Sequence, residues 1–132
     1  MNNTMQHHHL TLRAMLGTLA ICRLDADAPI PDWASGAGFV SITRTADELS
    51  IVIAEERVPD DVRCERDWKA LKVDGPLGFS LVGVLVSICR PLTDAGISVF
   101  AISTFDTDYV IVKHAHWARA LGVLCRHHFV NI

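Results

Sequence analysis

A chain of 132 residues and 14.5 kDa is long enough for one domain or for two small halves, and half of its residues are hydrophobic. This composition excludes a disordered or low-complexity protein. Twelve basic residues against fifteen acidic ones give a net charge of −3, so we expect no nucleic-acid partner, because the basic surface such a partner needs is missing.

The cysteines and the apolar runs indicate the compartment. Cys22, Cys64, Cys89 and Cys125 are too far apart for a zinc knuckle or a C-x-x-C pair, although their even number leaves disulfides open. The N-terminus, with its three histidines that are either native or from a tag, does not follow the pattern of an export signal. The longest apolar run is shorter than the roughly 18–20 residues of a membrane helix. We therefore expect a reduced cytoplasmic protein that does not bind membranes.

The first half of the sequence is typical of β structure. Alternating or β-branched residues predict strands over 10–16, 19–24, 39–43 and 48–54. Prolines and glycines in 25–38 predict a loop, and the polar link 44–47 predicts a hairpin. Residues 55–66 are charged, and we expect a surface connection there with one helical turn after Pro59.

The second half predicts the order β-α-β-β-α-β. The expected strands are 67–73, 97–103, 108–113 and 128–132, and the expected helices are 79–95 and 114–124. Apolar residues recur at helical spacing from Leu81 to Leu92, and Gly96 stands where a C-terminal cap belongs. Gly83 falls inside this expected helix, where glycine costs roughly 1 kcal/mol relative to alanine. The order predicts a ferredoxin-like split β-α-β fold with both helices on one face of an antiparallel sheet.

Two segments carry candidate binding groups. The turn Asp74–Gly78 leads into the expected helix, whose unpaired N–H groups and dipole favour an anion such as a carboxylate. The segment Ser103–Asp108 is crowded with hydroxyls and carboxylates, and Asp108 beside the helix start would accept an ammonium. In the alternative interpretation both segments are ordinary turns. The residues alone favour this alternative for Asp74–Gly78, and they do not decide between the two interpretations for Ser103–Asp108.

No pattern predicts catalysis. The G-x-S-x-G, P-loop and dinucleotide motifs are missing from the sequence, and neither Ser80 nor Ser87 has a histidine or acid partner in pattern. Cys89 lies on the apolar side of the expected helix, which is typical of a core thiol. His114 and His116 point to different helix faces and do not suit one metal ion. We predict no enzyme, no metal site and no cofactor.

Residues from about Trp68 to Lys113 resemble the ACT-domain family. The resemblance lies in the acidic and glycine-rich turn Asp74–Gly78, the apolar helix after it, and the pair Gly96–Ile97 that opens the next strand. Residues 100–112 resemble small bacterial tandem-ACT proteins, which are similar to the regulatory region of aspartate kinases and to eukaryotic arginine-sensor proteins. The resemblance implies an α+β protein with antiparallel sheets in two ACT-like, ferredoxin-like halves of βαββαβ type. Residues 1–66 would form a degenerate, β-rich N-terminal half and residues 67–132 a C-terminal ACT domain.

The resemblance also implies a regulatory, amino-acid-binding module without catalytic activity, and a homodimer. The family's ligand contacts correspond to Leu77, Gly78, Phe79, Ser80, Thr104, Phe105 and Asp108. In this hypothesis N–H groups around Leu77 to Ser80 meet the ligand carboxylate, Asp108 holds the ammonium with help from Thr104, and Phe105 forms a wall of the pocket. The alternative is a structural or protein-interaction domain that dimerises and binds no ligand.

Overall fold

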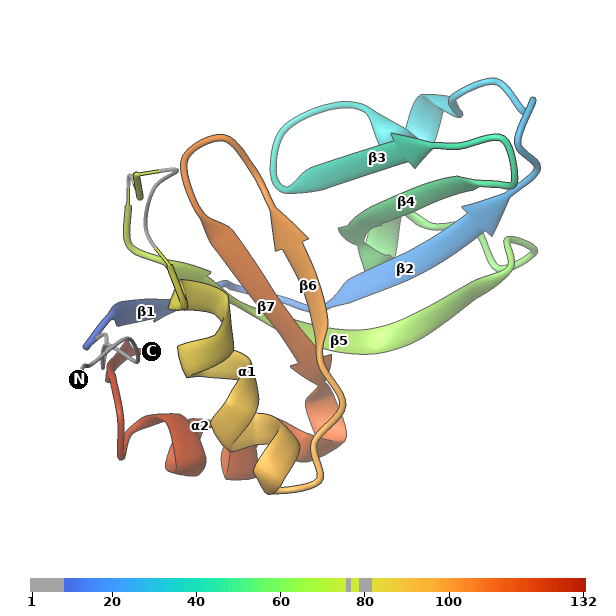
Figure 1. Cartoon of the computed structure of the whole chain (residues 1–132). Coiled ribbons are helices and arrows are strands. Elements are labelled where there is room, and N and C mark those ends of the chain that lie inside the picture. The colour runs from blue at the N-terminus through green and yellow to red at the C-terminus, as the bar shows by residue number, and fades with distance from the viewer. Residues whose placement is uncertain (1–8, 76, 79–81) are drawn as a thin grey trace. The chain divides into compact units, whose positions relative to one another are not determined.

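A computed structural model describes residues 9–75, 77–78 and 82–132, and they form two compact units (Figure 1). We call Gly17–Trp68 the β unit, and Lys69–Ile132 together with the described residues before Gly17 the helical unit. The boundaries of these units come from the contacts between residues. The expected division of the sequence into two halves, 1–66 and 67–132, therefore stays a prediction. No helix among the described residues is long and apolar enough to cross a membrane.

The β unit is an antiparallel sheet without an α-helix anywhere in Gly17–Trp68, all of which the structure describes. Its strands are β2 (Leu19–Leu24), β3 (Val40–Arg44), β4 (Leu49–Ala54) and the first residues of β5 (Cys64–Val73), in the order β3-β4-β2-β5. Alternate residues of β4 point into the core. The buried core residues are Ala20, Cys22, Ala34, Leu49, Ile51, Ile53 and Val58. This confirms the β-rich first half and the hairpin of β3 and β4.

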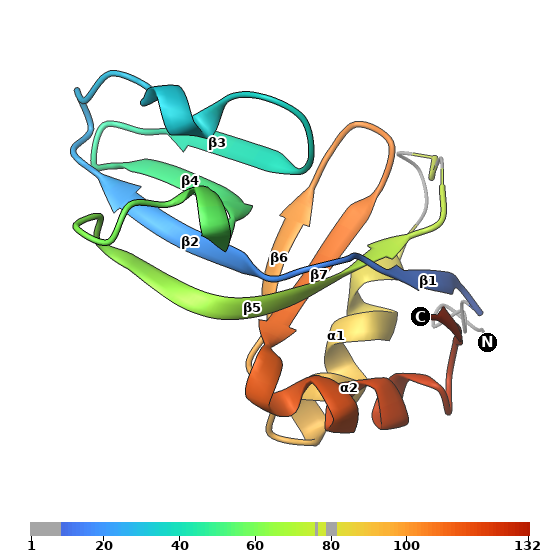
Figure 2. The same cartoon turned by 180° about the vertical axis from the view of Figure 1, so that it is seen from behind.

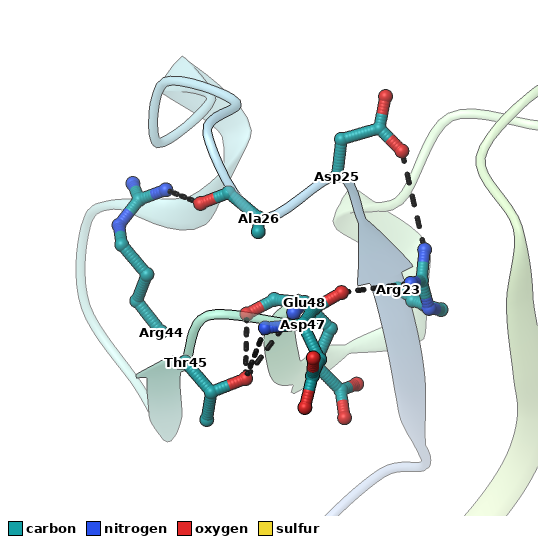
Figure 3. A network of polar contacts seen from close by, with 7 residues as sticks. All are labelled: Arg23, Asp25, Ala26, Arg44, Thr45, Asp47 and Glu48. Atoms are coloured by element: carbon teal, nitrogen blue, oxygen red, sulfur yellow. Dashed lines mark hydrogen bonds and ion pairs between the residues drawn. The ribbon is translucent and has the colours of Figure 1, made fainter.

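Side-chain hydrogen bonds to the backbone fix the loop 25–38 and the β3–β4 turn of the β unit (Figure 3). The Arg44 guanidinium donates to the carbonyl of Ala26, and Arg23 donates to the carbonyl of Asp47 at 3.0 Å. The Thr45 hydroxyl accepts the N–H of Asp47 at 3.1 Å in the β3–β4 turn. A loop rich in proline and glycine is thereby kept ordered without a helix, apart from the short 3₁₀ turn η1 (Asp32–Ala34).

The connection between β4 and β5 differs from its prediction. The helical turn is the 3₁₀ segment η2 (Glu55–Arg57), before Pro59 rather than after it, and β5 begins at Cys64 rather than at Asp67. The charged residues at its start pair with the backbone of β2, and the Arg66 guanidinium donates to the carbonyls of Glu55 and Val58, at 3.1 Å each. Their charge predicted a surface connection, but the backbone partners of β2 decide the structure.

The helical unit contains the predicted β-α-β-β-α-β order (Figure 2). Its elements are β5, α1 (Val84–Asp94), β6 (Phe100–Ser103), β7 (Asp108–Lys113), the 3₁₀ turn η3 (His114–His116), α2 (Trp117–Leu124) and β8 (Phe129–Asn131). A further strand, β1 (Thr11–Ala14), lies between β8 and β5, parallel to the first and antiparallel to the second. The N-terminal strand therefore completes the sheet of the helical unit.

Both helices pack on one face of this sheet, because alternate residues of β5 and β7 share a core with them. The buried members are Leu12, Leu71, Val73, Ile88, Leu92, Ile97, Val110, Val112, Ala120 and Leu124. The structure thus confirms an α+β protein with two halves, of which the first is degenerate and β-rich.

The ends of α1 correct one prediction and confirm another. The helix begins at Val84, and Gly83 precedes it with a φ of +83°, a left-handed conformation that suits glycine. The prediction that Gly83 lies inside the helix is therefore wrong. The expected helical residues 79–81 lie outside the described residues. At the other end Gly96 has a φ of +76°, and its N–H donates to the carbonyl of Thr93 at 2.9 Å, as expected for a cap.

A proline inside α1 leaves one helix carbonyl without its usual donor, and a histidine supplies the bond. Pro91 has no N–H to give to the carbonyl of Ser87. His128, only 7% exposed, places Nε2 at 3.0 Å from that oxygen. Its Nδ1 accepts the N–H of Leu10 at 3.2 Å, so Nε2 carries the proton and donates. The ring of His128 thereby links α1 to the residue just before β1.

Candidate functional site

The turn between β6 and β7 and the start of α1 line an open hollow of about 220 Å³ in the helical unit. We call it the hairpin hollow. Its lining residues come from three segments of the chain. They are Leu77, Gly78, Val84, Ser103, Thr104, Phe105, Asp106, Thr107 and Asp108.

The hollow brings together five of the seven residues that the sequence suggested as ligand contacts. Leu77, Gly78, Thr104, Phe105 and Asp108 all line it, and the other two, at positions 79 and 80, lie outside the described residues. Their contact with a ligand stays a prediction.

Four further lining residues were not among those predicted. Ser103, Asp106 and Thr107 belong to the polar segment that the sequence had already marked, so the signal for them was present. Val84 was missed because the helix was expected to start earlier.

The carboxylate of Asp108 is held by a side chain of the opposite strand. Ser103 and Asp108 are register partners at the end of the β6–β7 hairpin, and the Ser103 hydroxyl donates to Oδ1 of Asp108 at 2.6 Å. Among the described residues, Asp108 has no other hydrogen bond from a side chain. Within the described residues, the second carboxylate oxygen therefore has no side-chain partner.

The threonines of the same turn behave as the turn interpretation expects. The Thr107 hydroxyl, in a residue only 4% exposed, donates to the carbonyl of Val73 at 2.6 Å. The Thr104 hydroxyl donates to the carbonyl of Thr107 at 3.1 Å, and its N–H donates to the same carbonyl at 2.8 Å. These groups hold the turn in shape against β5, which fixes the walls of the hollow.

The segment after β5 lies tightly against this turn. The N–H of Leu77 donates to the carbonyl of Asp106 at 2.7 Å, so it is not free to meet a ligand carboxylate. A Cβ on Gly75 would be 3.0 Å from that same carbonyl oxygen and 3.3 Å from Cβ of Thr107. Glycine at 75 is therefore required by close approach of the two segments.

Asp74, which opens this segment, pairs with a residue of β1. Its Oδ1 accepts a 2.5 Å hydrogen bond from Nε of Arg13 on β1. This hydrogen bond lowers the pKa of the Asp74 carboxyl below its ordinary value. Asp74 is thus a surface ion-pair residue of the sheet and does not line the hollow.

The electrostatics of the hollow favour a positive group. Two carboxylates, Asp106 and Asp108, line it, and no lysine or arginine is among its described lining residues. Cys89 on α1 has a pKa above its ordinary value, because the thiol is buried and because the Asp108 carboxylate lies nearby. Asp108 therefore acts on α1 as well as on the hollow.

An exposed aromatic ring stands at the rim of the hollow. Phe105 lies at the tip of the β6–β7 turn and is 78% exposed. No group of three His, Cys, Asp or Glu side chains that would hold a metal ion occurs in the part of the chain that the structure describes.

Family models match most of the chain. Residues 63–126 match a model described as an ACT domain, which covers the elements from β5 to α2. Residues 17–61 match a separate model for an N-terminal domain, which covers most of the β unit.

Known proteins show the same likeness. The chain is 28% identical to the cytosolic arginine sensor for mTORC1 subunit 1 of Bos taurus over 130 residues, 88% of this chain but only 40% of that protein. The crystal structure of protein Atu0741 from Agobacterium tumefaciens has a TM-score of 0.88 and 40% identity, over 93% of this chain and 92% of that one. Aspartate kinase from Clostridium acetobutylicum shares the fold, with a TM-score of 0.63 and 11% identity over 89% of this chain and 33% of the kinase.

Proposed function

The chain belongs to the ACT-domain family, and from this membership we propose that it is a non-catalytic regulatory module that binds an amino acid in the hairpin hollow. The observation that carries the proposal is that a group that attracts an ammonium and a helix start that attracts a carboxylate line the same hollow. The carboxylate of Asp108 lines the hollow together with Val84, the first residue of α1. An amino acid carries the two charges that such an arrangement suits.

The ammonium of the ligand would bind the free oxygen of Asp108, whose other oxygen Ser103 already occupies. The carboxylate would meet the first-turn N–H groups of α1, which begin at Val84 and have no acceptor within the helix. This places the carboxylate contact later in the chain than the sequence suggested. Phe105 would cover the ligand side chain, and Gly78 would allow a close approach.

The size of the hollow supports a small ligand. Sites for drug-sized molecules usually measure about 300–1,000 Å³, whereas the hairpin hollow measures about 220 Å³. A single amino acid suits this volume better than a nucleotide or a large cofactor.

The charges of the hollow suggest which amino acid to test first. After Asp108 has paired with an ammonium, the carboxylate of Asp106 remains. A second positive charge on the ligand would pair with it, which favours a basic amino acid. The mammalian relative is named an arginine sensor, so arginine is the first candidate ligand. We also propose that the protein is cytoplasmic.

Isothermal titration calorimetry tests the proposal with ligands that lack one charge each. Arginine should bind, whereas agmatine without the carboxylate and N-acetylarginine without the ammonium should bind at least tenfold more weakly. Citrulline, which is neutral at the side chain, tests the contribution of Asp106. The proposal fails if none of the twenty amino acids releases or absorbs heat at millimolar concentration.

The second candidate is a domain that dimerises and binds no ligand. The edge strands β6 and β8 each have one strand neighbour among the described residues, and such edges are able to pair with another chain. Phe129 and Ile132, at the β8 edge, are 66% and 90% exposed. We propose a homodimer in either case, and light scattering at micromolar concentration would show it. Binding of an amino acid would support the first candidate function and contradict the second.

A further inference from the structure

Two cysteines of the β unit face each other on neighbouring strands. Cys22 on β2 and Cys64 at the start of β5 are register partners in an antiparallel pair. In the next pair along the strands, the N–H of Arg23 donates to the carbonyl of Arg63 at 3.0 Å. Because hydrogen-bonded and non-hydrogen-bonded pairs alternate, Cys22 and Cys64 form a non-hydrogen-bonded pair.

This type of pair brings side chains closest together. Its Cα atoms are typically about 4.5 Å apart, which lies at the short end of the about 4.4–6.8 Å range that disulfides span. Both thiols are free in the structure, and they lie close enough for one to hydrogen-bond the other. We propose that Cys22 and Cys64 form a reversible cross-strand disulfide when a small disulfide oxidant reaches the β unit.

The surroundings of the two thiols set the order of events. Cys64 is half-buried, whereas Cys22 is only 1% exposed, so an oxidant reaches Cys64 first. Burial raises the pKa of the Cys22 thiol to about 11, and the neighbouring Cys64 adds to this effect. Cys22 is therefore slow to ionise and acts second, as the resolving thiol.

The reaction is balanced with oxidised glutathione as the oxidant. The Cys64 thiol loses its proton, its sulfur attacks one sulfur of the oxidant, and the S–S bond breaks to release one glutathione thiolate, which takes up that proton. The Cys22 thiol then loses its proton, its sulfur attacks the Cys64 sulfur, and the second glutathione leaves as a thiol. Two protein thiols are oxidised by two electrons in total, and one small disulfide is reduced to two thiols.

The bond would tie β2 directly to β5. These strands otherwise meet through backbone bonds interrupted by a register shift between Leu19 and Ile21. A link there closes the chain segment that contains the β3–β4 hairpin and so restricts the unfolded state of the β unit. The other two cysteines, Cys89 and Cys125, are in the helical unit and serve as internal controls.

Peptide mapping tests the proposal on the full chain. The native protein is incubated with oxidised glutathione, remaining thiols are alkylated after denaturation, and trypsin cleaves after Arg13, Arg23, Arg63 and Arg66. Mass spectrometry should find one disulfide that joins the peptide 14–23 to the peptide 64–66. The oxidised protein should melt roughly 5–10 °C above the reduced one, and dithiothreitol should reverse both changes.

Matched variants keep the result interpretable. The double variant Cys89→Ser/Cys125→Ser should form the same link and show the same rise in melting temperature, and Cys64→Ser should show neither. If Cys22 and Cys64 stay fully alkylatable after oxidation of the native wild-type chain, or if the link appears only after the protein is unfolded, the proposal is overturned. Links only between protein molecules would overturn it as well.

Discussion

Ser103 and Asp108 face each other as the last register pair of the β6–β7 hairpin, and the Ser103 hydroxyl holds one carboxylate oxygen of Asp108 at 2.6 Å. The bond joins two side chains and does not fasten the backbone of the turn. The turn itself is closed by Thr104 and Thr107. Asp108 can therefore be changed without dismantling the turn, which makes it the most informative position of the proposed site.

Asp108→Asn should weaken amino-acid binding by roughly 30-fold or more, because losing one partner of a buried charge pair typically costs about 2–5 kcal/mol of affinity. The melting temperature without ligand should change little, since the asparagine oxygen still accepts the bond from Ser103. Calorimetry and thermal unfolding measure the two effects. The matched control is Asp94→Asn at the exposed end of α1, which should leave affinity unchanged; a variant at 108 that loses stability but keeps affinity would support the turn interpretation instead.

Thr107→Val should lower the free energy of unfolding by about 1–3 kcal/mol, because the buried carbonyl of Val73 loses its hydrogen-bond donor. Valine keeps the shape of threonine, so the effect isolates the hydroxyl. Urea unfolding measures it. Thr93→Val, at an exposed position of α1, should stay within about 0.5 kcal/mol of the wild type. Equal effects at both positions would contradict the assigned role of the Thr107 hydroxyl.

His128→Leu should destabilise the protein by about 1–3 kcal/mol, because the Ser87 carbonyl and the Leu10 N–H both lose their partner. The structural explanation is tested by a double-mutant cycle with Pro91→Ala, which restores a backbone N–H to the Ser87 carbonyl. The cost of removing His128 should be smaller in that background. His114→Leu, at an exposed histidine, is the control. Strictly additive effects of the changes at His128 and Pro91 would contradict the role of the His128 N–H as the replacement for the backbone N–H that Pro91 lacks.

Stability should fall at alkaline pH because of Cys22. Its pKa is about 11 in the folded protein and ordinarily 9.0, so the folded state binds the proton more tightly than the unfolded state. The contribution is fully present below about pH 9 and is lost as the pH rises toward 11, which amounts to about 1 kcal/mol between pH 8 and pH 10. Urea unfolding under reducing conditions measures this loss. Cys22→Ala should lack that part of the pH dependence, while Cys125→Ala, at an exposed site, should retain it; identical profiles for both variants would rule out this cause.

Local patterns predicted most of the elements but not their ends. The helix periodicity indicated α1, yet its start depends on the left-handed backbone of Gly83, which apolar spacing does not reveal. The start of β5 was hidden because charged residues occupy it, and its strand conformation comes from pairing with β2. The place of β1 beside β8 also depends on distant partners, so no local signal predicts it.

The candidate site was partly visible in the sequence. The crowding of hydroxyls and carboxylates around Asp108 is a local feature, and it marked the segment that lines the hollow. The contact between Leu77 and Asp106 and the pairing of Cys22 with Cys64 join residues far apart in the chain. Such pairings are set by strand register, which the sequence does not show directly.

The most direct test of the amino-acid site is the two-dimensional ¹H–¹⁵N NMR spectrum of the labelled chain during titration with arginine. We expect saturable shifts of the amide signals of Gly78, Thr104 to Asp108 and the first turn of α1, all of which belong to the hairpin hollow or its edge. The same titration with agmatine should leave the α1 signals nearly unchanged. Spectra that do not respond to any of the twenty amino acids at millimolar concentration, or that shift only at residues away from the hollow, would contradict the proposed site.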